Sequence, residues 1–300
     1  MDVTGKAMKN QGRAYLFAAI TVLLWSTVAT AFKIALRDLN NIEVLLIANL
    51  TSLVVFLGLL LVSGKTGLLK KETPKSLAFS AFQGLLNPFA YYLILFKAYS
   101  LLPAQVAQPT NFIWPVVLML LSAPLLKQPI RLTGVIALLV SFTGVLILSS
   151  QGNLSHFRIV EPAGIALSLS TSVIWAFYWI FNLRDHRDDL VKLFLGFLFS
   201  SVYILIVAAF TGTFTGIFQK PLMVAVYIGL FEMGITFALW LKALQLSDST
   251  GKVANLIYIT PFASLLFIHF VLHEELYYTS FIGLALIIAG ILAGRIKKRA

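Results

Sequence analysis

Ten apolar segments of roughly 20 residues follow one another along the chain, separated by short polar connections. A helix needs about 20 apolar residues to cross the hydrocarbon core of a bilayer. Because lipid cannot hydrogen-bond an unpaired backbone, each segment is predicted to be a membrane-spanning helix. The segments are 14–36, 42–63, 76–98, 103–126, 132–150, 162–182, 191–211, 221–245, 252–272 and 279–296.

The small number of charged residues supports this class. Only 12% of the 300 residues are charged and 59% are hydrophobic, whereas soluble domains carry about 25% charged residues. So few ionisable groups cannot cover a water-facing surface, and we therefore expect an all-α membrane protein rather than a soluble enzyme. The chain has no cysteine, which excludes disulfides, thiolate metal sites and cysteine nucleophiles. No cofactor or metal is expected.

The basic residues predict the orientation. The formal net charge is +11, but Lys and Arg sit in short loops and at the chain ends, so the charge does not indicate a nucleic-acid surface. With the N-terminus placed in the cytoplasm, 17 of these residues fall on the inner side and 4 on the outer side. The positive-inside rule then places both termini in the cytoplasm. We expect a multi-pass protein of the bacterial inner (plasma) membrane.

An internal repeat divides the chain into residues 1–150 and 151–300. Thr21 and Trp25 match Thr171 and Trp175, and Pro115 matches Pro261. The offset settles from 150 to about 145 residues, as a small loop deletion would produce. Five helices per half is an odd number, so the second copy enters the membrane upside down. Such inverted repeats are typical of alternating-access transporters, which bind their substrate between the halves.

These residues resemble the drug/metabolite transporter superfamily, EamA type, over essentially the whole chain. The landmarks are Leu24-Trp25-Ser26, Trp175, the two prolines Pro115 and Pro261, and His273-Glu274-Glu275-Leu276 before the last helix. The resemblance implies ten helices in two inverted five-helix repeats. Within the superfamily, Asn111-Phe-Ile-Trp114-Pro115 and Ile174-Trp175-Ala176-Phe-Tyr178 look most like the aromatic amino-acid exporter branch.

Glu232 is the most informative single residue, because it falls near the middle of the segment 221–245. A charged side chain at the bilayer centre costs about 2.5–3.5 kcal/mol even on insertion scales. Glu232 must therefore face a wet cavity, hold a partner or stay protonated. It is predicted to bind a substrate amino group or to carry a proton; the structural alternative is a hydrogen bond to a neighbouring helix. Its repeat counterpart is Asn87, predicted on the opposite wall of the same cavity.

Further candidates are polar and aromatic residues within the segments. Gln108, Asn111 and Trp114 recur every three residues, which places them on one helix face that should point away from lipid; interhelical hydrogen bonding is the alternative. Aromatic rings near mid-span would suit a flat or apolar substrate, although packing also explains them. The predicted substrate-binding residues are Trp25, Asn87, Tyr91, Gln108, Asn111, Trp114, Trp175, Tyr178, Glu232 and Tyr258.

The sequence thus predicts a secondary transporter that exports small amphiphilic metabolites, amino acids including aromatic ones, by alternating access around a central cavity. Its partners would be a small-molecule substrate and the lipid bilayer, with no nucleic acid, and the chain is predicted to be a monomer. One alternative is a drug or quaternary-cation exporter, with Glu232 as counter-charge and the aromatic rings as a cation–π cage. A membrane-embedded enzyme or lipid flippase is a further alternative, which would need paired His or Asp residues near one membrane face.

Overall fold

The structure of the chain is a computed structural model that describes residues 10–126, 132–153, 161–215, 217–248, 253 and 255–294. Every regular element within these ranges is helical. Several basic residues used to predict the orientation lie outside them: Lys6, Lys9, Lys127, Arg131, Arg158, Lys252 and the four basic residues after Gly294.

Six helical spans among the described residues are long and apolar enough to cross a membrane. Four are single helices: α1 (Gln11–Asp38), α2 (Asn41–Val62), α8 (Pro162–Leu183) and α9 (Asp189–Phe210). The other two spans are each interrupted by a π-helical turn. One consists of α3 (Pro74–Gly84), the π-helical turn η2 (Leu85–Ala90) and α4 (Tyr91–Leu101). The other consists of α10 (Met223–Ile228), the π-helical turn η4 (Gly229–Gly234) and α11 (Ile235–Leu246).

Shorter helices make up the rest. They are α5 (Ala104–Asn111), α6 (Trp114–Leu126), α7 (Leu132–Ser149), η5 (Asn255–Ile259), α13 (Thr260–Leu272) and α14 (Tyr278–Gly294), with short 3₁₀ turns η1 (Thr66–Lys71) and η3 (Ile217–Gln219) in the connections. The all-helical membrane architecture predicted from the sequence is confirmed.

The predicted segment 103–126 is not one helix, because it divides into α5 and α6 around Phe112 and Ile113. Proline has no backbone N–H and its ring clashes with the carbonyl four residues earlier. Pro115 therefore cannot bond to the carbonyl of Asn111. The helix ends at Asn111 and a new one begins at Trp114, so this span bends where it carries polar side chains.

Helices α2 and α9 pack against each other and are tied at both ends by ion pairs. Lys65, just after α2, lies 2.6 Å from Asp188 at the N-terminus of α9. Lys220, after α9, lies 2.6 Å from Glu43 in the first turn of α2. The two helices are therefore antiparallel. Each half of the chain donates one lysine and one carboxylate, in the reciprocal arrangement that an inverted repeat produces.

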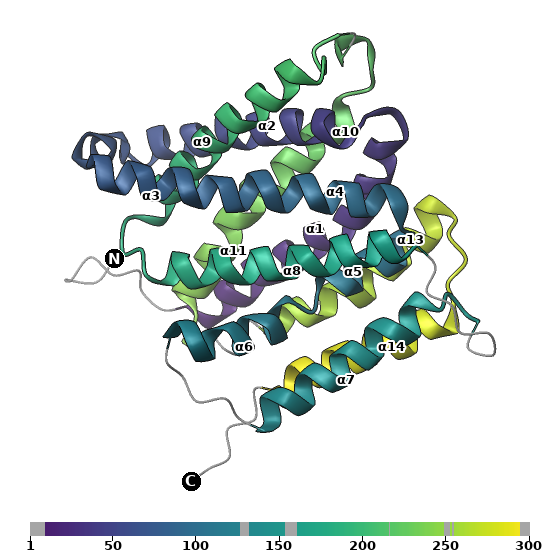
Figure 1. Cartoon of the computed structure of the whole chain (residues 1–300). Helices are drawn as coiled ribbons and strands as arrows, with labels where there is room; N and C mark the ends of the chain where they lie inside the picture. Colours follow the sequence, from purple (N-terminus) through teal and green to yellow (C-terminus); the bar gives the residue numbers. More distant parts are fainter. Residues whose placement is uncertain are drawn as a thin grey trace.

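Helices α7 and α14 form a close pair along the edge of the molecule opposite α2 and α9 (Figure 1). Their contact depends on glycine. A Cβ atom on Gly144 would come within 2.5 Å of the backbone oxygen of Gly283, and a Cβ on Gly283 would meet the backbone oxygen of Gly144 at the same distance. Gly290 likewise faces Ala137 and Ser141 of α7, so the small-residue face of α14 packs within the same chain.

Candidate functional site

A cavity of about 580 Å³ lies between the two halves. Its walls come from α1, α4, α5 and α6 of the first half and from α8, α9, η4, α11, η5 and the start of α13 in the second. Among the described residues, none from α2, α7 or α14 lines it. This volume is within the range of small-molecule sites, and corresponding segments of the two repeats face each other across it.

Trp175 is the centre of the aromatic wall. Its ring centroid lies 4.7 Å from that of Tyr91 and 5.7 Å from that of Tyr178. It also contacts Trp114, Trp179 and Phe237 at 6.2–6.4 Å. The repeat counterpart Trp25 lies in a second group with Phe237 and Trp240. The tilted and edge-on arrangements leave ring faces and edges on the cavity wall, where they can pack against a flat or apolar solute.

Glu232 lines the cavity from the π-helical turn η4. Its carboxylate oxygen Oε1 accepts a hydrogen bond from the hydroxyl of Tyr92 on α4, at 3.0 Å. The indole N–H of Trp25 donates to the backbone oxygen of Glu232 at 3.4 Å. π-helical turns occur mostly at functional sites. The carboxyl group is thus fixed by contacts from the first half of the chain while it faces the cavity.

Two amide side chains of α5 reach the same cavity but differ in their hydrogen bonding. Asn111 accepts from the hydroxyl of Tyr91 at 3.1 Å and donates to Thr171 Oγ1 at 2.7 Å, so its amide already has a partner on each side. The carbonyl oxygen of Gln108 is buried and has no hydrogen-bond partner among the described residues. Gln108 can therefore accept a hydrogen bond from a bound solute.

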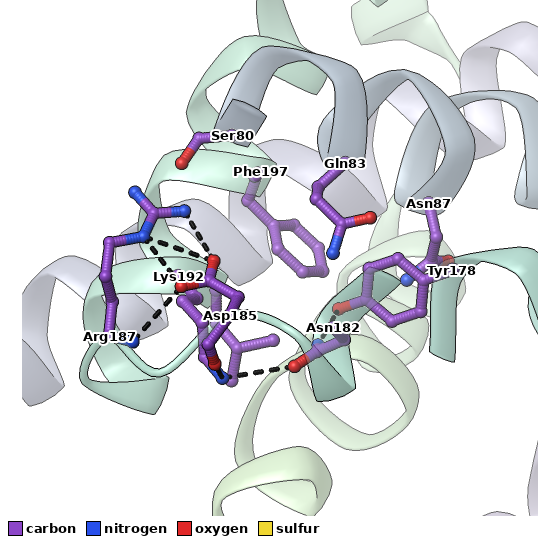
Figure 2. Close-up of a pocket in the computed structure, with 11 residues that line it drawn as sticks. Ser80, Gln83, Asn87, Tyr178, Asn182, Asp185, Arg187, Lys192 and Phe197 are labelled. Atoms are coloured by element: carbon purple, nitrogen blue, oxygen red, sulfur yellow. Dashed lines mark hydrogen bonds and ion pairs between the residues drawn. The ribbon is translucent and has the colours of Figure 1, made fainter. Parts of the chain in front are cut away.

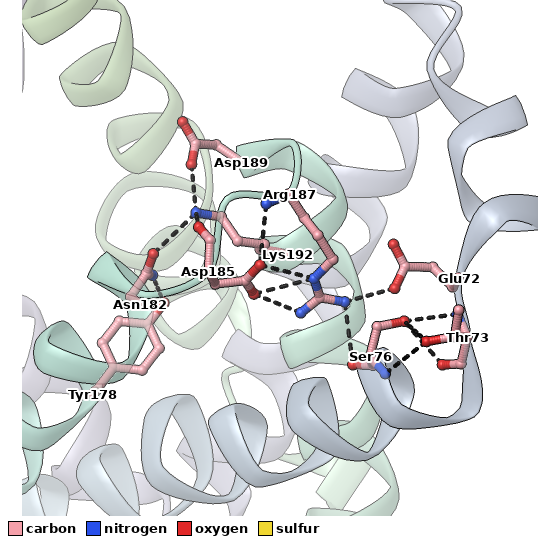
Figure 3. A network of polar contacts seen from close by, with 9 residues as sticks. All are labelled: Glu72, Thr73, Ser76, Tyr178, Asn182, Asp185, Arg187, Asp189 and Lys192. Atoms are coloured by element: carbon pink, nitrogen blue, oxygen red, sulfur yellow. Dashed lines mark hydrogen bonds and ion pairs between the residues drawn. The ribbon is translucent and has the colours of Figure 1, made fainter.

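One end of the cavity is polar and lies at the loop between α8 and α9. Asn182, Asp185, Asp189 and Lys192 line it there, and Figure 3 shows the network that holds them. The ammonium of Lys192 donates to Asn182 Oδ1 and to the backbone oxygen of Asp185, both at 3.1 Å, and lies 2.8 Å from Asp189. The ionisable acids and bases that line the cavity are three carboxyl groups, those of Glu232, Asp185 and Asp189, and one ammonium group, that of Lys192.

Arg187 joins this loop to the first half. It contacts both carboxylate oxygens of Asp185, at 2.6–3.1 Å, and reaches Glu72 at 2.6 Å (Figure 3). Burial alone would raise the pKa of Asp185, but hydrogen bonds from the side chain and backbone of Arg187 outweigh it and hold the pKa below its ordinary value. Asp185 therefore stays ionised at neutral pH.

The opposite end of the cavity is closed by contacts between α5 and the segment before α14. The carboxylate of Glu274 accepts from the backbone N–H of Ala104 at 3.0 Å. Gln105 donates to the backbone oxygen of Glu275 at 2.8 Å and accepts from the hydroxyl of Ser280 at 2.7 Å. Lys33 of α1 donates to the backbone oxygens of Tyr99 and Leu102, each at 3.0 Å. The bonds of Glu274 and Gln105 connect the two halves, whereas those of Lys33 lie within the first half, beside Tyr99, which lines the cavity at this end.

Asn87 does not line the large cavity. It lies in a smaller pocket between η2, α8 and α9 (Figure 2). Tyr178 lines both spaces. The sequence predicts Asn87 on the cavity wall opposite Glu232. In the structure Asn87 lies behind Tyr178 instead. Asn87 has non-helical backbone angles and precedes Pro88, which bends its segment away from the regular path.

The other nine predicted residues all line the large cavity: Trp25, Tyr91, Gln108, Asn111, Trp114, Trp175, Tyr178, Glu232 and Tyr258. Sequence reasoning missed Tyr92 and the polar mouth formed by Asn182, Asp185, Asp189 and Lys192. The charged run 184–189 reads as an ordinary loop between two helices. The bonds of Arg187 to Glu72, 115 positions away, and of Lys65 to Asp188 join this loop to the first half. Asp185 and Asp189 line the cavity there.

A helical bundle whose halves enclose a polar, aromatic cavity is the architecture of a polytopic membrane protein. The chain belongs to the EamA-like transporter family, which matches it in two stretches, residues 12–150 and 162–293. This places it among membrane transporters of the drug/metabolite transporter superfamily, and the two matches fit the repeat found in the sequence.

Relatives agree with this class. An uncharacterized transporter of Archaeoglobus fulgidus is 24% identical over 93% of this chain and 96% of its own length. An uncharacterized transporter of Clostridium kluyveri is 22% identical over 93% of this chain and 91% of its own. A solved structure described as "Crystal structure of protein" is similar in fold, with a TM-score of 0.63 and 21% identity over 95% of this chain and 97% of that one.

Proposed function

We propose that the chain is a secondary transporter that exports small amphiphilic metabolites bearing an amino group, amino acids including aromatic ones among them. It would work by alternating access in the bacterial inner membrane, as a monomer with ten spans. Residues 1–150 and 151–300 would form two inverted five-helix repeats. The paired match of the family to both halves and the reciprocal ion pairs of α2 and α9 support this arrangement.

One observation carries the proposal: a carboxylate faces a cavity whose remaining surface is largely aromatic. Glu232 can accept hydrogen bonds from an ammonium group, because only Oε1 is engaged by Tyr92 among the described residues. The rings around Trp175 provide an apolar surface for the side chain of the solute. A charge-assisted hydrogen bond with a flat apolar contact is what an amphiphilic amine requires.

The contacts at the two ends define the conformation in this scheme. With both termini in the cytoplasm, the loop bearing Asp185 and Lys192 lies on the inner side. The contacts of Glu274 and Gln105 with the neighbouring half then lie on the outer side. The structure would thus represent an inward-facing state with a closed outer gate. Export would require the outer contacts of Glu274 and Gln105 to break. The inner ion pairs, Lys65 with Asp188 and Arg187 with Glu72, would have to rearrange as the inner side closes.

A second candidate function is export of a quaternary cation or cationic drug. The aromatic rings that line the cavity together with Glu232, such as Tyr91 and Trp175, favour it, because aromatic faces bind cations that have no hydrogen to donate. In that case Glu232 would act as a counter-charge at a distance rather than as a hydrogen-bond acceptor.

Flux measurements separate the two candidates. The purified full-length chain, reconstituted in liposomes, would be loaded in parallel with labelled phenylalanine, labelled leucine and a fluorescent quaternary dye. We expect phenylalanine to leave fastest and unlabelled phenylalanine, but not its N-trimethylated analogue, to compete. Competition by the trimethylated analogue alone would favour the second function. Absence of flux above that of empty liposomes for all three solutes would contradict both.

A further inference from the structure

Gln105, in the first turn of α5, is 1% exposed, and its side chain bonds to the segment that leads into α14. Its amide nitrogen Nε2 donates to the backbone oxygen of Glu275 at 2.8 Å and to the carboxylate of Glu274 at 3.4 Å. Its oxygen Oε1 accepts from the hydroxyl of Ser280 at 2.7 Å and from the backbone N–H of Tyr277 at 3.3 Å. Both ends of this one amide are therefore held by the second half of the chain.

Glu274 holds the same end of α5 through the backbone. The first N–H groups of a helix have no acceptor within the helix, and a carboxylate near them also interacts favourably with the helix dipole. Oε1 of Glu274 accepts from the N–H of Ala104, the first residue of α5, at 3.0 Å. Glu274 and Gln105 together attach the start of α5 to the segment that leads into α14.

The other side of α5 is bonded to α8. The hydroxyl of Ser168 donates to the backbone oxygen of Ala107 at 3.0 Å, and the amide of Asn111 donates to Thr171 Oγ1 at 2.7 Å. Because α8 also carries Trp175, α5 and α8 together form one wall of the cavity. The contacts of Gln105 thus join this wall to the segment that leads into α14.

The two sides of α5 differ in their access to water. Ser168 and Thr171 are 0% exposed, whereas Glu274 is partly exposed and Glu275 is exposed. A buried hydrogen bond that breaks leaves its donor and acceptor unpaired, but water can replace a bond that lies at the surface. If the wall moves, its separation from the segment that leads into α14 therefore costs less than the separation of α5 from α8.

We propose that Gln105 is a positioning residue that holds the wall of α5 and α8 against the segment that leads into α14, and that the closed end of the cavity opens where this contact separates. The place of this opening in an export cycle rests on the proposed function, whereas the opening itself does not. Loss of the side-chain bonds of Gln105 should shift the chain toward a state in which this end is open.

Thiol labelling from each side of the membrane tests the proposal, because the chain has no cysteine of its own. Ala29 lines the cavity from α1, and Ala29→Cys is the reporter. Two exposed positions identify the sides: Asp38→Cys marks the side of Glu274, and Lys75→Cys marks the side of the α8–α9 loop. A membrane-impermeant thiol reagent, added to right-side-out or to inverted vesicles, gives the labelling rate of the reporter from each side.

Two variants release the contact to different extents. Gln105→Met keeps the length of the side chain but removes both of its polar ends. We expect it to raise the labelling rate of Ala29→Cys from the Glu274 side at least tenfold, with no rise from the other side. Ser280→Ala removes one of the bonds and should give a smaller rise. Ser149→Ala, whose hydroxyl bonds within α7, is the matched control and should label as the unmodified reporter does.

If neither Gln105→Met nor Ser280→Ala raises the labelling rate from the Glu274 side, the proposal is overturned. A similar rise from both sides would also overturn it, because the variants would then loosen the whole fold. No solute is present in the measurement, so an error in the proposed function leaves these outcomes unaffected. Absence of flux together with side-dependent labelling would contradict the proposed function alone.

Discussion

The hydroxyl of Tyr92 donates a hydrogen bond to Oε1 of Glu232 at 3.0 Å, across the boundary between the two halves of the chain. Tyr92 lies on α4 and Glu232 on the repeat-related span that contains η4. The carboxylate of Glu232, which lines the cavity, is thus oriented by the half that does not contain it. Any rocking of the halves changes this contact and with it the direction of the carboxylate.

Glu232→Gln keeps the shape of the side chain and its acceptor oxygen but removes the charge. A hydrogen bond to a charged group contributes about 1.5–3 kcal/mol, so flux of an amine substrate at subsaturating concentration should fall about 10- to 100-fold. The rate at which the labelled amine substrate leaves reconstituted liposomes measures this change in flux. Glu275→Gln, at an exposed position, serves as the control and should leave flux unchanged. Equal flux in the two variants would remove Glu232 from substrate binding.

Trp175→Ala removes the indole ring that contacts Tyr91, Trp114 and Tyr178 in the aromatic wall of the cavity. Aromatic contacts contribute about 0.5–1.5 kcal/mol beyond burial, so the apparent affinity for an aromatic substrate should fall about 2- to 10-fold, with a smaller change for leucine. Trp175→Phe should recover part of the loss. Phe177→Ala, two positions further along α8 and stacked on Phe181 outside the cavity lining, is the control. A loss of the same size for leucine and phenylalanine would indicate general collapse of the cavity rather than lost ring contact.

The ion pair of Asp185 and Arg187 predicts a dependence of stability on pH. The folded state holds the pKa of Asp185 below its ordinary value, so the ionised form stabilises the fold above the unfolded pKa of about 3.9. That contribution is lost as the pH falls through the lower, folded pKa. We therefore expect Asp185→Asn to lower the unfolding midpoint at pH 7 and to reduce its further decline below pH 4.

The control for this measurement is Asp38→Asn, which alters an exposed carboxylate at the end of α1. It should leave the midpoint at pH 7 nearly unchanged. If Asp185→Asn proved as stable as the unmodified chain at pH 7 and equally sensitive to acid, the loop network would not contribute to stability.

Gly144→Ala tests the contact between α7 and α14. The new Cβ would lie within 2.5 Å of a backbone oxygen that cannot turn away, so the helices must separate, at a cost of about 1–3 kcal/mol. Gly58→Ala in α2, where a Cβ meets nothing within 4 Å, should be neutral or stabilising by about 0.5–1 kcal/mol. Denaturant unfolding in detergent compares the two. Equal stabilities would show that α7 and α14 are free to move apart.

The sequence alone predicts the membrane class, the positions of the apolar spans and nine of the residues that line the cavity. These depend on local patterns, such as the length of apolar runs and the polar or aromatic residues within them. The apolar pattern does not indicate the break between α5 and α6, since it predicts 103–126 as one helix. Glu232 was predicted to lie in a cavity because an isolated acid in lipid is costly, and it lines the cavity.

The remaining features depend on contacts between distant positions. Nothing in the residues around Tyr92 indicates that it reaches Glu232, 140 positions away. Asn87 occupies the repeat position of Glu232, yet its non-helical backbone turns it behind Tyr178. In the sequence Lys65 and Asp188 are ordinary charged loop residues. Their ion pair depends on the antiparallel packing of α2 and α9. Such relationships are set by how the helices pack, which a single sequence does not specify.

The absence of cysteine from the sequence allows a direct test of the cavity as the path of the solute. Leu241 lines the cavity, whereas Leu57 is 40% exposed on α2 outside it. Single variants Leu241→Cys and Leu57→Cys would be reconstituted and treated with a water-soluble thiol reagent on both sides of the membrane. We predict that labelling Leu241→Cys stops flux of phenylalanine and that excess phenylalanine slows the labelling, while Leu57→Cys keeps its flux. Full labelling of Leu241→Cys with undiminished flux would contradict the account.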